Sequence, residues 1–289
     1  MSLTKKIILI FLLIFISSTL AFMLINNKKS EKYNKNINVV NNKSKVKEHK
    51  NKYLEKRNFS CSEVIYNDKS IPVIMYHSID NKEDSELRVS TNKFLEQMTY
   101  LKENNYTTLT LDELYEFFIN NKPVPKKSLV ITFDDGYRDN YENAYPILKK
   151  FDFHAIIFVV TSTIDNDVNC LTSNQIKEMK FNGIDIQSHT LKHDNLYELT
   201  YNEQLETLKK SKNDLEKMLN NKVKYLAYPY GMWNDNTIKA LKECDYIMAF
   251  TTNSGWANKD NGLYKLNRVY INGNADLNEF KRRINNANY

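Results

Sequence analysis

Short apolar runs alternate with segments of helical spacing along most of this 289-residue chain. The runs typical of buried strands are 72–76, 129–133, 155–160, 184–186, 225–227, 246–251 and 268–271. The segments with helical spacing are 92–104, 111–119, 141–150, 173–181, 201–219, 236–243 and 276–286. Two of these helices follow capping boxes, Thr110 with Glu113 and Thr200 with Glu203. Strands that alternate with helices predict an α/β fold with a parallel sheet, and this number of repeats favours a closed or distorted barrel.

The first part of the chain has a different pattern. Lys5 and Lys6 precede an uncharged, mainly apolar stretch over residues 7–25, close to the roughly 20 residues that a membrane helix requires. Residues 18–21 make a poor cleavage site because apolar residues continue beyond them. We therefore expect residues 1–25 to be an uncleaved signal anchor in the cell membrane, with the rest of the chain outside the cell; cleavage and secretion remain open.

Residues 26–66 are rich in Lys and Asn and poor in apolar residues, so this segment is predicted to be a disordered tether. The remaining residues, 67–289, are predicted to form one domain. The tether supplies much of the formal net charge of +6, so this charge does not indicate a nucleic-acid partner. The 3 cysteines, an odd number without a C-x-x-C motif, exclude a fully paired disulfide framework and a cysteine zinc site. We expect a monomer.

Two polar motifs follow strand-like runs and together indicate a metal site. Asp134 and Asp135 follow an apolar run and precede Gly136. Because side chains alternate along an extended backbone, one carboxylate can bind a cation while the other faces a water molecule. His189 and His193 can share one face of a helical turn, and carboxylate with imidazole is a ligand set that zinc accepts. Each motif alone could be an ordinary turn; their joint occurrence favours hydrolytic metal chemistry.

These motifs also resemble those of a known family. Residues 132–136, the pair His189 and His193, and residues 228–231 are similar to the first three motifs of the polysaccharide deacetylase family, the NodB homology domain of carbohydrate esterase family four. The resemblance covers about residues 71–271. It implies a distorted (β/α) barrel with fewer than eight units that hydrolyses N-acetyl, sometimes O-acetyl, groups on carbohydrate polymers.

The resemblance also implies a role for each motif residue. Asp134 corresponds to the general base. The implied ligands of a divalent metal are Asp135, His189 and His193. The backbone N–H of Tyr230, which follows Pro229, would bind the oxyanion. Zinc suits the ligand set, while cobalt, nickel and iron remain open.

Two departures from the family pattern bear on the mechanism. Tyr228 stands where most members have an arginine, and no histidine follows His193 to serve as general acid. His77, after the first predicted strand, resembles the acid histidine of the branch that deacetylates poly-N-acetylglucosamine, so we assign it as general acid; a structural strand-end histidine is the alternative. Arg268 is a candidate for the electrostatic partner of Asp134.

The predicted partner is therefore an N-acetylated glycan polymer, and the leading substrate is extracellular poly-N-acetylglucosamine. Tyr230 and Trp233 are expected to line the polymer groove, because flat rings cover the apolar faces of sugars. Peptidoglycan N-acetylglucosamine is the alternative substrate. A non-catalytic carbohydrate-binding domain is an alternative of another class, but such a domain would be expected to have lost Asp134 or a metal ligand.

Overall fold

The computed structural model describes residues 57–59, 63–82 and 85–289. The predicted anchor and Cys61 lie outside the described residues, as does most of the predicted tether. Of the helices within the described ranges, none has the length and apolar character needed to cross a membrane. Cys170 and Cys244 are buried and unpaired.

Seven parallel strands form a closed barrel within the described part of the chain. They are β2 (Val73–Tyr76), β7 (Ser128–Phe133), β8 (Ala155–Val159), β9 (Ile184–Ser188), β10 (Tyr225–Ala227), β11 (Met248–Ser254) and β12 (Leu266–Tyr270). Each pairs with its neighbour in the order β2-β12-β11-β10-β9-β8-β7, and a pairing of β2 with β7 closes the ring. The predicted α/β barrel and its strand segments are confirmed.

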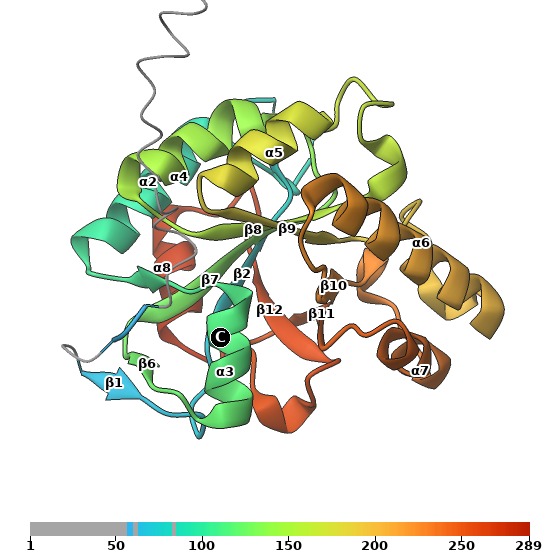
Figure 1. The fold of residues 1–289 in the computed structure, drawn as a ribbon. Helices are drawn as coiled ribbons and strands as arrows, with labels where there is room; N and C mark the ends of the chain where they lie inside the picture. Colours follow the sequence, from blue (N-terminus) through green and yellow to red (C-terminus); the bar gives the residue numbers. More distant parts are fainter. Residues whose placement is uncertain (1–56, 60–62, 83–84) are drawn as a thin grey trace, which may run out of the picture. The chain divides into compact units, whose positions relative to one another are not determined.

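Helices surround the strands (Figure 1). They are α2 (Thr91–Glu103), α3 (Leu111–Asn120), α4 (Tyr145–Phe151), α5 (Ser173–Phe181), α6 (Tyr201–Leu219), α7 (Asp235–Glu243) and α8 (Leu277–Asn285). Both predicted capping boxes are present, Thr110 with Glu113 at α3 and Thr200 with Glu203 at α6. The predicted helix over 141–150 is instead a π-helical turn, η2 (Asn140–Ala144), followed by α4.

The remaining elements are short. The short strands are β1 (Val64–Ile65), β3 (Ser78–Ile79), β4 (Arg88–Val89), β5 (Thr107–Thr108) and β6 (Val124–Pro125). The 3-10 turns are η3 (Thr161–Thr163), η4 (Leu196–Glu198), η5 (Pro229–Gly231) and η6 (Lys259–Asn261). The pattern of apolar residues predicted none of them, because two or three residues show too little periodicity.

Alternate residues of the barrel strands pack on opposite sides. Val73 belongs to a core cluster inside the barrel, whereas its neighbour Ile74 belongs to the larger cluster under the surrounding helices. The inner cluster includes Leu114 and Phe117 of α3. The first residue of β10, Tyr225, hydrogen-bonds Asp112 of α3. Helix α3 therefore closes the end of the barrel where the strands begin. The polar residues lie at the opposite end, where the strands finish.

The folded domain begins before the predicted boundary at residue 67. Val64–Ile65 pair antiparallel with β6. Arg57 donates through Nε to Glu113 at 2.8 Å and through Nη2 to the carbonyl of Thr108 at 2.8 Å. The polar composition that predicted a tether over 26–66 does not reveal these contacts, because they are made by a two-residue strand and one arginine.

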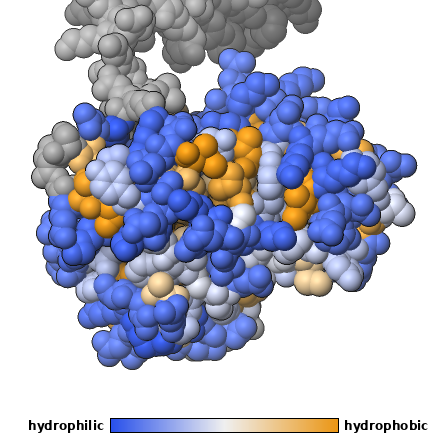
Figure 2. Space-filling model, turned by 90° about the horizontal axis from the view of Figure 1, so that it is seen from below, coloured by the Kyte–Doolittle hydropathy of each residue, from blue (hydrophilic) through white to orange (hydrophobic). Residues whose placement is uncertain are grey.

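The surface is mainly hydrophilic on the face that Figure 2 shows, where apolar residues gather only in small, separated patches. The exposed large apolar residues of the described ranges are Tyr66, Leu87, Ile119, Val168, Phe181, Tyr197, Tyr230 and Met232. Two of them, Tyr230 and Met232, flank Gly231, and the ring of Tyr230 contacts that of the predicted metal ligand His193.

Candidate active site

The predicted site residues lie where the barrel strands end. His77 follows β2, Asp134 follows β7 and His189 follows β9. In the β2–β7 ladder Tyr76 pairs with Phe133, and the N–H of Asp134 donates to the carbonyl of Tyr76 at 3.0 Å. Because parallel strands end at the same edge, this register sets His77 beside Asp134.

Asp135, His189 and His193 converge on one point. Oδ1 of Asp135 lies 3.3 Å from Nε2 of each histidine, and the three ligand atoms lie within 4.8 Å of one another. That oxygen is buried and accepts no hydrogen bond from the described residues. Nδ1 of His189 lies 2.7 Å from the carbonyl of Ala227, so Nδ1 carries the hydrogen and Nε2 keeps a lone pair. Three ligand atoms that face one point, one carboxylate oxygen and two imidazole nitrogens, fit a divalent metal ion.

The two histidines do not share a helical turn, contrary to the prediction. Residues 190–192 form a turn in which Thr190 has φ 67°, and His193 has φ 60°. Thr190 accepts the N–H of Asp194 through its hydroxyl at 3.2 Å, and Leu191 donates to Thr207 of α6 at 3.2 Å. These bonds hold a tight non-helical loop, and the imidazole rings still meet with centroids 4.9 Å apart.

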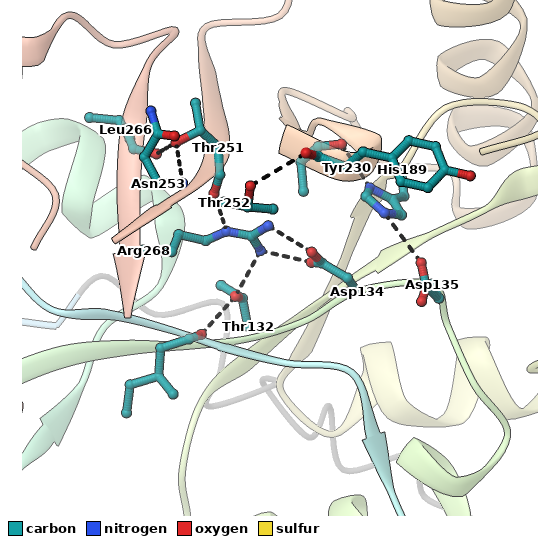
Figure 3. A network of polar contacts seen from close by, with 12 residues as sticks. Thr132, Asp134, Asp135, His189, Tyr230, Thr251, Thr252, Asn253, Leu266 and Arg268 are labelled. Carbon is teal, nitrogen blue, oxygen red and sulfur yellow. Dashed lines mark hydrogen bonds and ion pairs between the residues drawn. The ribbon is translucent and has the colours of Figure 1, made fainter. Parts of the chain in front are cut away.

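Asp134 forms a buried ion pair with Arg268 (Figure 3). Nη1 and Nη2 of Arg268 donate to the two carboxylate oxygens at 2.7 and 2.6 Å. Nε of Arg268 also donates to the carbonyl of Thr251 at 2.9 Å, and Nη1 donates to the hydroxyl of Thr132 at 3.3 Å. Burial alone would raise the pKa of Asp134, but the charge of Arg268 holds this pKa below its ordinary value. Asp134 is therefore a carboxylate at neutral pH.

The backbone of the Asp-Asp-Gly motif explains why the two carboxylates point in different directions. Asp134 directly follows β7, whereas Asp135 has φ 71° and Gly136 has φ 75°. A Cβ on Gly136 would lie 2.9 Å from Cγ1 of Val159, so only glycine fits this turn. Figure 3 shows the result: Asp134 faces Arg268 and Asp135 faces His189. Burial would raise the pKa of Asp135, but the two histidines beside its carboxylate lower this pKa below its ordinary value.

His77 is half-buried at the same edge. Its Nδ1 is buried and has no hydrogen-bond partner among the described residues. Burial lowers the pKa of His77, and the charges of Asp134 and Asp135 raise it only in part. The imidazolium form of His77 is therefore a stronger acid than an exposed histidine.

The loop after β10 brings one predicted residue to the metal ligands and leaves another apart. Tyr230 has φ 59° in the turn η5, and its ring meets that of His193 with centroids 4.5 Å apart. Trp233 packs instead beside Tyr228, with ring centroids 6.5 Å apart, and Lys265 lies 4.6 Å over its ring. Tyr228 itself is fully buried and donates its hydroxyl to the carbonyl of Tyr264 at 2.9 Å.

Comparison with known proteins identifies the family. A model of the family "Polysaccharide deacetylase" matches residues 121–249. The putative polysaccharide deacetylase YxkH of Bacillus subtilis is 39% identical over 201 residues, which are 70% of this chain and 71% of the relative. The chain belongs to the polysaccharide deacetylase family. A poly-β-1,6-N-acetyl-D-glucosamine N-deacetylase of Staphylococcus epidermidis is 33% identical over 208 residues, 68% of this chain and 72% of that relative.

Solved structures of polysaccharide deacetylases share the fold. The deacetylase PplD of Streptococcus pyogenes, solved with acetate, is 35% identical with a TM-score of 0.72 and is matched over 75% of this chain and 98% of its own. The putative polysaccharide deacetylase BA0330 of Bacillus anthracis is 33% identical with a TM-score of 0.67, over 75% and 69% of the two chains. The chain is an N-deacetylase of this family, so the non-catalytic alternative is set aside.

The sequence analysis of this deacetylase gave no part in the reaction to several polar residues around the site. Thr132 accepts from Arg268 and donates to the carbonyl of Ile74 at 2.7 Å. Burial, together with the charge of Asp135, raises the pKa of Tyr137. Asp139 and Asn140 bond the residues that follow β2. The one sequence signal that could have found these four residues is their position. All of them lie within β7 or a few residues after it, close to the two aspartates.

Proposed function

We propose that this deacetylase is metal-dependent and removes N-acetyl groups from poly-β-1,6-N-acetyl-D-glucosamine outside the cell. The observation that carries the reaction is the arrangement at the barrel edge, where a buried carboxylate fixed by Arg268 stands beside a cluster of Asp135, His189 and His193. The proposed substrate is supported by relatives whose names include this activity. The candidate acid histidine after the first strand of the barrel supports it as well.

Asp135, His189 and His193 would hold the divalent ion, and zinc fits one carboxylate and two imidazoles. When bound, such an ion supplies Lewis-acid chemistry: it acidifies water and polarises the acetyl carbonyl. The ligand set also accepts cobalt, nickel or iron, so the choice of metal follows from availability as well as affinity.

The chain's own residues move the protons. A carboxylate oxygen of Asp134 accepts a proton from the water whose oxygen bonds the acetyl carbon, and Arg268 keeps that carboxylate ionised and aimed. The N–H of Tyr230 donates to the developing oxyanion. The imidazolium of His77 then donates its proton to the sugar nitrogen as the C–N bond breaks. The products are acetate and a glucosamine unit.

The side chains of Tyr230 and Trp233 are proposed to contact the glycan. Tyr230 is 62% exposed beside His193, so its ring can cover the face of a sugar held at the metal. Trp233 lies three residues further along the same loop and is half-buried. Its ring therefore belongs to the wall of the groove rather than to the point of reaction.

The location of the enzyme is part of the proposal. The apolar stretch over residues 7–25, with Lys5 and Lys6 before it, supports a single-pass anchor that leaves the catalytic domain outside the cell. External protease applied to intact cells should then release active enzyme. Release only after lysis would place the domain inside.

The deciding experiment measures acetate release by the purified domain from two polymers, poly-β-1,6-N-acetyl-D-glucosamine and peptidoglycan glycan strands. We expect faster release from the exopolysaccharide, and loss of release on both polymers after chelation, with recovery when Zn²⁺ is returned. Faster release from peptidoglycan would overturn the proposed substrate. Full activity in a sample shown to contain no metal would overturn the proposed mechanism.

A further inference from the structure

Asp139 and Asn140 hold the backbone around His77. Nδ2 of Asn140 donates to the carbonyl of His77 at 2.8 Å. The carboxylate of Asp139 accepts the hydroxyl of Ser78 at 2.5 Å and the N–H of Ile79 at 3.0 Å. His77, Ser78 and Ile79 are thus hydrogen-bonded to two consecutive residues of the loop after β7.

The amide of Asn140 has one possible orientation. Its Nδ2 lies 2.8 Å from the carbonyl of His77 and 2.9 Å from Oδ1 of Asp139. Both neighbours are acceptors only, so the nitrogen must face them. Asn140 is 1% exposed, and its own Oδ1 has no hydrogen-bond partner in the described part of the chain. A buried amide that leaves its oxygen unpaired is held at this position for its donor group.

The ring of His77 lacks a comparable support. Its buried Nδ1 meets no hydrogen-bond partner among residues 57–59, 63–82 and 85–289. The direction of the ring therefore depends on the backbone that carries it. The carbonyl bound by Asn140 belongs to that same residue, so the bond restrains the residue from which the imidazole projects.

The π-helical turn η2 explains how Asn140 reaches His77. It begins at Asn140, a few residues after Asp134 and Asp135, and the N–H of Arg138 is tied to the carbonyl of Asn169 at 2.7 Å. Single π-helical turns occur often at functional sites. One continuous loop after β7 thus carries the base, a metal ligand and the residue that holds His77.

We propose that Asn140 is a positioning residue that aims His77 at the leaving nitrogen. The inference rests on the proposed function, in which His77 is the general acid. Loss of the Asn140 amide should leave the metal and the base in place and should slow only the step that needs the proton.

The experiment compares Asn140→Ala, His77→Ala and the double variant on two substrates, an N-acetylglucosamine oligomer and 4-nitrophenyl acetate. The ester's leaving group departs without protonation. Asn140→Ala should lower kcat on the oligomer by about 10-fold to 10²-fold, as expected for a misplaced catalytic group, and should change ester hydrolysis little. In the His77→Ala background the same change should have no further effect on the oligomer, because the group that it positions is absent.

Asn143→Ala is the matched control, because Nδ2 of Asn143 donates from the same turn to the carbonyl of Ile79 at 2.7 Å. Any loss that it causes should be equal on the two substrates and should persist in the His77→Ala background. Bound zinc and melting temperature are measured for every variant. Asn140→Asp, which replaces the donor by an acceptor, repeats the test if Asn140→Ala does not fold.

Three outcomes would overturn the inference. The first is equal loss on both substrates, the second is a loss that multiplies with that of His77→Ala, and the third is failure of both Asn140 variants to fold. Failure of the proposed function looks different. In that case His77→Ala itself keeps parental turnover on the oligomer, or the parent protein releases no acetate.

Discussion

Asp134 and Asp135 are neighbours in the chain with different partners, and their substitution should separate base from ligand. Asp134→Asn should keep bound metal and lose turnover, because its remaining oxygen still accepts from Arg268 but no longer takes a proton. Asp135→Asn should weaken metal binding, because it removes the charged ligand. Metal content and acetate release are measured together. If only Asp135→Asn is inactive while both variants bind metal like the parent, the two roles are reversed.

Arg268→Met tests the buried ion pair. Removing the guanidinium leaves Asp134 buried and unpaired, which typically costs about 3–5 kcal/mol of stability. Burial then raises the pKa of Asp134, and only the smaller effects of His189 and His77 remain to oppose the rise. Because the base works only when deprotonated, the acid limb of the pH–rate profile should move to higher pH. Thermal unfolding and the pH profile provide the measurements.

Arg282→Met is the control for that substitution, because Arg282 pairs with Glu279 on the surface. Exposed ion pairs contribute little to stability, so melting temperature and pH profile should stay near those of the parent. Equal behaviour of the two variants would show that Arg268 does not set the charge of Asp134.

The sequence located the motif residues but not how they are held. Recognisable sequence patterns include Asp134, Asp135, His189 and His193. Arg268 was a candidate only because it is an arginine before a late predicted strand. Its pairing with Asp134 requires the closed barrel, since β2 lies between β12 and β7. Nothing local in the sequence specifies that closure. The bond from Asn140 to His77 was missed for the same reason, because it joins residues 63 positions apart.

At the scale of elements, two glycines at the ends of 3-10 turns, Gly231 in η5 and Gly262 directly after η6, offer a matched pair of substitutions. A Cβ on Gly231 would lie 2.1 Å from Oγ1 of Thr252, whereas one on Gly262 meets nothing within 4 Å. Both glycines have positive φ, so Ala costs about 1–3 kcal/mol at either position. At Gly231 the overlap adds a similar amount and must shift Tyr230.

Gly231→Ala should therefore reduce kcat as well as melting temperature, while Gly262→Ala should lower melting temperature alone. Acetate release and thermal unfolding are measured for both variants. If Gly231→Ala retained parental kcat, the position of Tyr230 would not matter for turnover.

Element prediction succeeded where periodicity extended over several residues and failed where it did not. The helix α6, with 19 residues and a capping box, was predicted with its observed ends. The H-x-x-x-H spacing suggested a helical turn, but spacing alone does not report the positive φ of Thr190 and His193. A spacing of four residues brings two side chains together in a tight loop as well as in a helix.

In the barrel as a whole, the contacts that stabilise the fold and the candidate catalytic residues lie at opposite ends. Helix α3 and Arg57 lie at the end where the strands begin, and the candidate catalytic residues lie where the strands finish. This division is typical of (β/α) barrels, in which residues at the starting ends of the strands serve stability. Changes at the starting end should therefore alter unfolding without altering catalysis.

Two truncations test this separation. A chain that begins at residue 67 lacks the β1–β6 pairing and the bonds of Arg57 to Glu113 and Thr108, whereas one that begins at residue 56 keeps them. Each hydrogen bond contributes about 1 kcal/mol, so the shorter chain should be less stable by roughly 2–4 kcal/mol. Its bound metal and kcat should match those of the longer chain at a temperature where both are folded. Arg57→Ala in the longer chain should give part of the loss. Equal melting temperatures would mean that these N-terminal contacts add nothing, and a lower kcat for the shorter chain would mean that the two ends of the barrel are coupled.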